Sequence, residues 1–215
     1  MKTQIVPYFP LKYISDKIIS GLLILLCSPV FIMIFIIMSL NMLFSSKDRG
    51  SFFYRETRIS HGKPFSILKF RMVKQKYAEQ AHQTNTCIRE FEDDLSQLTW
   101  TGRYLLKNRY LDELPQLFNI LKGDMSLVGP RPLAIPLVQA QMDAGITFRN
   151  QIIAGWTSKV QIQYKGVDID KNYTREELDQ MYVDFCLKSN QWQIWRFDIW
   201  ILFRTIEVFI QGKGI

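Results

Sequence analysis

Hydrophobic positions in this 215-residue chain are concentrated in one long run near the N-terminus. No charged residue occurs between Ile18 and Ser46, a stretch of 29 positions. As a straight helix this stretch would be about 43 Å long at roughly 1.5 Å per residue, whereas the hydrocarbon core of a bilayer is only about 30 Å thick. The run contains Ser28-Pro29 near its middle, and proline removes a helical hydrogen bond and crowds the preceding turn. We therefore expect a membrane helix broken at Ser28-Pro29.

The flanking charges indicate how this segment meets the membrane. Bases precede it at Lys12 and Lys17, and a stronger cluster begins at Lys47, so the positive-inside tendency favours a cytoplasmic position for the rest of the chain. The arms before and after the break, about 11 and 17 residues, are each too short to cross the hydrocarbon core. A re-entrant helix fits these lengths, a Pro-kinked spanning helix stays open, and a cleaved signal peptide is disfavoured. Residues 11–19 form a candidate amphipathic approach helix, with Lys12, Asp16 and Lys17 on its polar side.

The rest of the chain mixes short β-type and longer α-type patterns, which predicts a helix-dominated α+β fold. We expect residues 1–46 to form the membrane anchor and residues 47–215 to form one small cytoplasmic domain with interfacial helices. We expect the polar stretch 74–97 to form an exposed helix or a loop. Strands are predicted at 52–54, 65–68 and 160–164. Helices are predicted within 102–111, 114–121 and 132–144, from Thr174 onward, and over 194–210, where the tryptophans suit either a core or a membrane interface.

Composition and charge narrow the class of protein. The chain is 47% hydrophobic and 22% charged, which excludes a disordered or low-complexity protein. Its net charge is +7, and residues 47–76, with nine Lys and Arg against two Asp and Glu, carry an equal excess. A basic block after an apolar run favours anionic lipid or phosphate ligands, and no nucleic-acid-binding module accompanies it. Three unpaired cysteines and two histidines supply neither a disulfide framework nor a zinc site.

Adjacent carboxylates are the first candidate for chemistry. Asp112 and Glu113 lie between apolar residues just before Pro115, which suits the first turn of a helix. One interpretation is that these acids stabilise the helix dipole. The other is that one carboxylate attacks a phosphorus centre or a carbohydrate while its neighbour binds a metal.

Basic residues supply the other candidates. Residues 129–132 hold Arg131 between two prolines, where its planar guanidinium either binds phosphate or makes an ordinary surface ion pair. Lys69 and Arg71 likewise either bind phosphate or form the edge of a basic strand.

Taken together and in this order, these motifs resemble a known family, the bacterial sugar transferases. They are also called monotopic phosphoglycosyl transferases or polyprenyl-phosphate sugar-phosphate transferases. The most specific blocks are 111–117 and 121–132, and three shorter blocks at 53–55, 62–65 and 69–72 add to them. The resemblance implies that Asp112 is the nucleophile, that Glu113 assists through Mg²⁺, that Arg131 contacts phosphate, and that Ser28-Pro29 breaks a re-entrant helix. We also expect Lys69 and Arg71 to bind the phosphorylated substrates.

Some positions depart from the family pattern. Glu56 replaces a usual glutamine, and the segment 107–110 replaces a usual Arg-Lys-Thr-Ser, so the basic contact there is either Lys107 or Arg109. Residues 154–158 are Ala-Gly-Trp-Thr-Ser, where the family usually has Pro-Gly-Ile-Thr-Gly. These departures concern the nucleotide and sugar contacts and leave the pair of carboxylates intact.

The resemblance also implies a reaction and a location. A sugar-1-phosphate would pass from a UDP-sugar to polyprenyl (undecaprenyl) phosphate through a covalent aspartyl-phosphosugar, with release of UMP. The reaction would initiate assembly of a capsule, exopolysaccharide, lipopolysaccharide or other glycoconjugate at the cytoplasmic face of the bacterial inner membrane. Membrane lipids are expected partners, nucleic acid is not, and the aromatic final helix offers a homodimer contact. The alternative is a non-catalytic membrane adaptor whose basic block binds anionic lipid.

Overall fold

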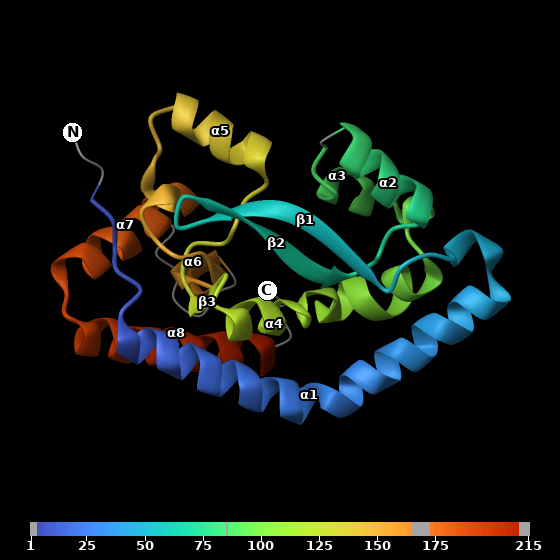
Figure 1. Cartoon of the computed structure of the whole chain (residues 1–215), viewed down its shortest axis with the longest axis horizontal. Helices are drawn as coiled ribbons and strands as arrows, with labels where there is room; N and C mark the ends of the chain where they lie inside the picture. The colour runs from blue at the N-terminus through green and yellow to red at the C-terminus, as the bar shows by residue number, and fades with distance from the viewer. Residues whose placement is uncertain (1–3, 85, 165–172, 211–215) are drawn as a thin grey trace. The chain divides into compact units, whose positions relative to one another are not determined.

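The computed structural model describes residues 4–84, 86–164 and 173–210. It confirms a helix-dominated α+β fold with small sheets (Figure 1). The helices of six or more residues are α1 Pro10–Phe44, α2 Gln75–Thr84, α4 Gln116–Lys122, α5 Ile135–Asp143, α6 Lys159–Tyr164, α7 Arg175–Lys188 and α8 Gln191–Ile210. The strands are β1 Phe53–Ser60, β2 Lys63–Phe70, β3 Ser126–Val128 and β4 Gly155–Thr157, and short helical turns include α3 Arg89–Glu92, the π-helical η3 Gly102–Leu106, η4 Lys107–Arg109 and η5 Leu111–Glu113.

The chain divides into two compact units, which are described separately. The dyad unit comprises Leu22–Glu56 and Ser66–Phe118. The terminal unit comprises Met1–Gly21, Thr57–Phe65 and Asn119–Ile215. Helix α1 and the β1–β2 hairpin each contribute to both units.

Helix α1 continues through the predicted break. Its 35 residues span about 52 Å, and among the described residues it is the helix long and apolar enough to cross a membrane. Pro29 cannot donate an amide hydrogen to the carbonyl of Leu25. The hydroxyl of Ser28 donates to that carbonyl at 2.8 Å instead, so the serine replaces the lost donor and the helix is not interrupted.

The dyad unit is built around one face of α1. Phe31, Ile34 and Met38 are buried in a core that also contains residues of the hairpin and of η3. Phe35 meets Phe70 of β2 with ring centroids 5.5 Å apart. The opposite face of the helix carries exposed apolar side chains at helical spacing, namely Leu22, Leu25, Leu26, Ile32, Met33, Ile36, Leu40 and Leu43.

The terminal unit contains a parallel pair of strands that the sequence did not predict. Ser126 pairs with Gly155 and Val128 with Thr157. The backbones approach closely at this pair. A Cβ on Gly155 would lie 2.0 Å from the amide nitrogen of Gly129, and a Cβ on Gly129 would lie 2.7 Å from the carbonyl oxygen of Ile153. Both positions therefore require glycine.

The strand predicted at 160–164 is wrong, because these residues form α6. The alternation of apolar and polar residues suggested one buried face, yet Gln161 and Gln163 are buried together with Ile162. The hydroxyl of Ser158 accepts a hydrogen bond from the amide of Val160 at 3.2 Å, which stabilises the first turn of a helix.

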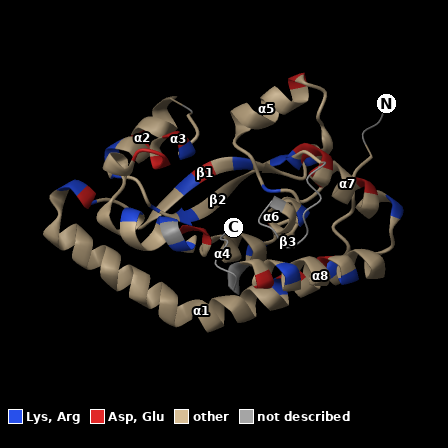
Figure 2. Ribbon diagram, turned by 180° about the vertical axis from the view of Figure 1, so that it is seen from behind, with Lys and Arg blue, Asp and Glu red and all other residues tan. Residues whose placement is uncertain are grey.

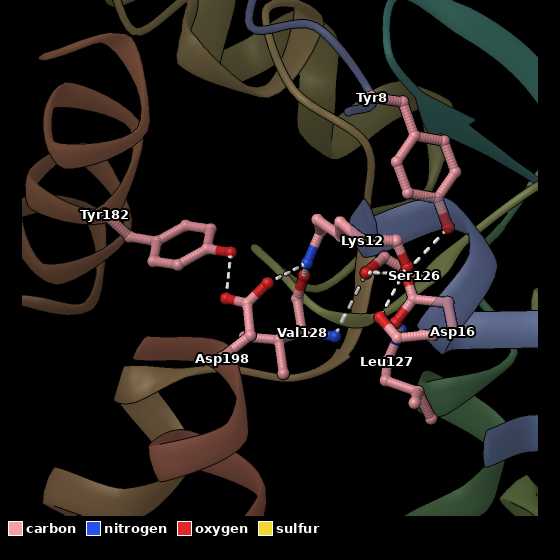
Figure 3. Close-up of polar contacts among 9 residues, drawn as sticks. Tyr8, Lys12, Asp16, Ser126, Leu127, Val128, Tyr182 and Asp198 are labelled. Carbon is pink, nitrogen blue, oxygen red and sulfur yellow. Dashed lines mark hydrogen bonds and ion pairs between the residues drawn. The ribbon is translucent and has the colours of Figure 1, made fainter. Parts of the chain in front are cut away.

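A buried polar network fixes the start of α1 in the terminal unit (Figure 3). Lys12 donates to the carbonyl of Val128 at 2.9 Å and pairs with Asp198 of α8. Asp198 also accepts a 2.6 Å hydrogen bond from the hydroxyl of Tyr182. The prediction that Lys12 and Asp16 form a polar outer side is therefore wrong, since they are only 5% and 4% exposed.

Asp16 makes the second half of this network. Its carboxylate accepts hydrogen bonds from the hydroxyls of Tyr8 and Ser126 at 2.7 and 2.6 Å, and from the amide of Leu127 at 3.3 Å. The polar residues of the first α1 turns thus bind β3 inside the unit, where buried charges need such partners.

Candidate active site

Two short turns in the dyad unit determine the position of the adjacent carboxylates. Tyr110 ends η4 with a left-handed backbone (φ 53°) and starts η5, which contains Asp112 and Glu113. A positive φ is unfavourable for a residue with a bulky side chain, so the surrounding structure must hold it. Pro115 follows, and α4 begins at Gln116. This reversal buries both acids, which are 4% and 8% exposed.

Lys69 of β2 lies between the two carboxylates. Its Nζ is 3.3 Å from Oδ2 of Asp112 and 3.5 Å from Oε1 of Glu113. All three side chains are largely buried, which strengthens their electrostatic interaction. The sequence predicted Lys69 as a phosphate contact, and the structure brings its ammonium group to the dyad itself.

Burial and neighbouring charges change the pKa of Asp112, the candidate nucleophile. Burial raises the pKa of Asp112 to about 6, and the negative charges of Glu113 and Glu92 act in the same direction while Lys69 opposes them. At neutral pH the carboxylate is still mostly ionised, and its higher basicity makes it a better nucleophile than an exposed aspartate.

A close backbone contact supports the helical turns before the dyad. A Cβ on Gly102, the first residue of η3, would lie only 2.2 Å from the carbonyl oxygen of Met72. The hydroxyl of Thr99 links the two segments, because it accepts from the amide of Gly102 at 2.9 Å and donates to the carbonyl of Met72 at 3.1 Å. Sequence reasoning did not assign a role to Gly102 or Tyr110, since neither a close approach nor a positive φ has a reliable sequence signal.

Arg71 has a structural environment. It is 1% exposed, and its guanidinium donates to the carbonyls of Ser51, Val73 and Asp48 at 2.6 to 2.8 Å. The geometry therefore gives no support to its predicted phosphate contact.

The remaining predicted basic residues are Lys107, Arg109 and Arg131. Lys107 is half-buried and donates to the backbone carbonyl of Glu92, whereas Arg109 is exposed on the turn before the dyad. Arg131 belongs to the terminal unit, where Arg149 donates to its carbonyl oxygen at 2.7 Å.

The carboxylates fit the predicted Mg²⁺. Within the described ranges no cluster of three or more Asp, Glu, His or Cys forms a closed metal cage. Mg²⁺ commonly uses one or two carboxylates together with substrate phosphates and water. Both carboxylates contact Lys69, and the negative charge of Glu92 acts on Asp112 as well. Glu113 would hold the ion.

A family model described as "Bacterial sugar transferase" matches residues 7–212. The chain belongs to this family.

Curated relatives extend the comparison. The undecaprenyl-phosphate galactose phosphotransferase of Salmonella typhimurium is 33% identical over 214 residues, covering 95% of this chain and 41% of the relative. The UDP-glucose:undecaprenyl-phosphate glucose-1-phosphate transferase of Escherichia coli is 32% identical over 206 residues, covering 91% and 39%. The exopolysaccharide production protein ExoY of Rhizobium meliloti is 31% identical over 211 residues, covering 93% and 85%. The chain thus spans about two fifths of the Salmonella and Escherichia relatives and most of the Rhizobium protein.

Proposed function

We propose that this sugar transferase moves a sugar-1-phosphate from a UDP-sugar to undecaprenyl phosphate and thereby initiates polysaccharide synthesis. The observation that carries the proposal is the buried pair Asp112 and Glu113 with Lys69 between them. The names of the Salmonella and Escherichia relatives support the donor and acceptor classes. A merely structural pair of helix-capping acids would not require this buried lysine.

The first chemical step uses the ionised carboxylate of Asp112. One of its oxygens attacks the phosphorus next to the sugar, the bond from that phosphorus to the bridging oxygen breaks, and UMP leaves with the electron pair. A phosphosugar remains on Asp112 as an acyl phosphate. Lys69 offsets the repulsion between the carboxylate and the diphosphate, and Mg²⁺ at Glu113 would supply further charge stabilisation when bound.

The second step regenerates the enzyme. A phosphate oxygen of the lipid attacks the same phosphorus, the bond to the Asp112 oxygen breaks, and the carboxylate returns to its ionised form. The product is a lipid diphosphate sugar. Because the intermediate is covalent, UMP release does not require the lipid acceptor.

Helix α1 supports a position at the cytoplasmic membrane surface. In the dyad unit, the helix packs one face against the protein between Cys27 and Met42 and exposes the other face as an apolar strip. Most of this helix is free of charge, whereas Lys and Arg residues lie along β1 and β2 (Figure 2). A vertical crossing would carry those charges into hydrocarbon at high cost. We therefore infer partial immersion of the exposed face of α1 in one leaflet, without a break of the helix at Ser28-Pro29.

The test is UMP release from a panel of UDP-sugars by purified full-length protein, with and without Mg²⁺. We expect Asp112→Asn to abolish the initial burst of UMP and Lys69→Met to slow it by at least about 100-fold, as the removal of a transition-state charge does elsewhere. Asp93→Asn is the matched control, because Asp93 is exposed and ends α3 outside the dyad. Normal UMP release from Asp112→Asn would refute the nucleophile assignment. Unchanged function in both Asp112→Asn and Glu113→Gln would favour the adaptor.

A further inference from the structure

The dyad unit contains a cavity of about 500 Å³ between the start of β1 and α2. Tyr54 and Arg55 belong to the wall on the strand side, and Gln75, Glu79 and His82 belong to the wall on the helix side. Neither the dyad nor Lys69 lines it. The cavity is therefore a separate compartment of the same unit, and the chemistry proposed above leaves it unassigned.

The outer edge of β1 contributes backbone groups to this cavity. The amide of Arg71 donates to the carbonyl of Phe52 at 2.9 Å, and Phe53 stacks on Phe70 with centroids 5.4 Å apart. In an antiparallel ladder the hydrogen-bonding direction alternates from residue to residue. The amide and carbonyl of Arg55 therefore point away from β2, toward the side on which, within the described residues, this sheet has no third strand.

The helix side supplies a flat aromatic surface and fixed polar groups. The rings of His82 and Tyr54 lie 5.1 Å apart with an angle of 30°. Gln75 accepts from the amide of Ser51 at 3.3 Å and donates to Glu79 at 3.0 Å. An aromatic surface next to a strand edge suits a planar heterocycle whose own donor and acceptors pair with a backbone amide and carbonyl.

The register of the hairpin brings this cavity close to the reacting centre. If Phe52 pairs with Arg71 and Phe53 with Phe70, then Tyr54 is opposite Lys69, with Cβ atoms about 5 Å apart. Lys69 in turn contacts both carboxylates of the dyad. In a UDP-sugar, a ribose and one phosphate separate the base from the phosphorus next to the sugar, so a donor bound at the dyad needs a separate, nearby compartment for its base.

We propose that this cavity binds the nucleoside half of the donor, with the uracil ring against His82 and the strand edge at Arg55. This inference rests on the proposed function, because it takes a UDP-sugar as the donor. It assigns the cavity to the part of the substrate that departs as UMP.

The test introduces a large side chain into the cavity at an exposed residue of α2. Glu79→Trp places a large ring in the cavity, and Gln80→Trp is the matched control, because Gln80 is exposed on the same helix and does not line the cavity. We expect Glu79→Trp to raise KM for the UDP-sugar and the inhibition constant of UMP by at least tenfold each, with kcat at saturation within about twofold. Gln80→Trp should leave all three values within twofold.

A second variant protects the test against a folding failure. His82→Ala removes the aromatic surface from an exposed residue and should raise both constants three- to tenfold, with an unchanged circular dichroism spectrum. Wild-type KM and UMP inhibition in either folded variant would overturn the assignment while leaving the proposed function in place. If the wild-type protein released UMP from no UDP-sugar and bound no UMP in calorimetry, the proposed function itself would fail.

Discussion

The buried pair of Lys12 and Asp198 makes a sharp prediction about stability. The two side chains are 6% and 8% exposed, and the carboxylate also accepts from Tyr182. Asp198→Asn keeps the shape and a hydrogen-bond acceptor but leaves the ammonium of Lys12 buried without its counterion. Breaking one side of such a pair costs about 3 to 5 kcal/mol, which for a chain of this size lowers Tm by roughly 6 to 20 °C.

Tryptophan fluorescence during heating in detergent is a suitable assay. Four of the five tryptophans lie in the terminal unit, at positions 156, 192, 195 and 200, so the signal reports mainly on the unit that contains the pair. Asp198→Asn should unfold at a clearly lower temperature than the wild type. The double variant Lys12→Met with Asp198→Leu should recover most of the loss, because well-packed apolar residues often replace a buried ion pair without cost.

An exposed ion pair on the same helix provides the control. Arg204 and Glu207 lie 2.7 Å apart but are 31% and 43% exposed, and pairs of this kind contribute about 0.2 to 1 kcal/mol or nothing measurable. Glu207→Gln should therefore change Tm by a few degrees at most. Equal shifts for Asp198→Asn and Glu207→Gln would refute the reasoning that burial makes the Lys12 pair important.

Two further predictions concern backbone packing and pH. Gly102→Ala should destabilise the dyad unit and lower UMP release, because the new methyl group would lie 2.2 Å from the carbonyl oxygen of Met72; unfolding followed at Trp100, together with the activity assay, measures both effects. Burial raises the pKa of Asp179 to about 6, above the unfolded value of about 3.9, so its stabilising contribution is complete below about pH 4 and disappears as pH rises through 6. Denaturation midpoints between pH 4 and 7.5 should show this loss in the wild type and lack it in Asp179→Asn, and equal pH profiles would contradict it.

The sequence predicted those elements whose signals are local. The β1–β2 hairpin follows from two apolar stretches around Gly62, which adopts φ 70°, although both strands are longer than expected. The start of α7 follows from Thr174. Its side chain accepts from the amide of Glu177, and the carboxylate of Glu177 accepts from the amide of Thr174. Such caps depend on residues three positions apart, which is why a single sequence reveals them.

The pairing of β3 with β4 lacked a local signal. Each strand has three residues, and all of β3 is buried, so neither alternation nor length distinguishes them from a loop. Their pairing depends on the close approach of Gly129 and Gly155, which are far apart in the chain. Only the assembled unit brings these glycines together.

The same reasoning explains how much of the candidate site was predictable. Asp112 and Glu113 stand out because adjacent acids between apolar residues are unusual, but Lys69 lies 43 residues away from Asp112. In the sequence Lys69 and Arg71 are two similar bases two positions apart. The two bases differ in their surroundings. The single ammonium of Lys69 lies between two carboxylates, whereas the planar guanidinium of Arg71 donates to three carbonyls, two in the turn before β1 and one just after β2. A lysine in place of Arg71 would lack the fixed fork of donors, so these two bases are not interchangeable although the sequence pattern treats them alike.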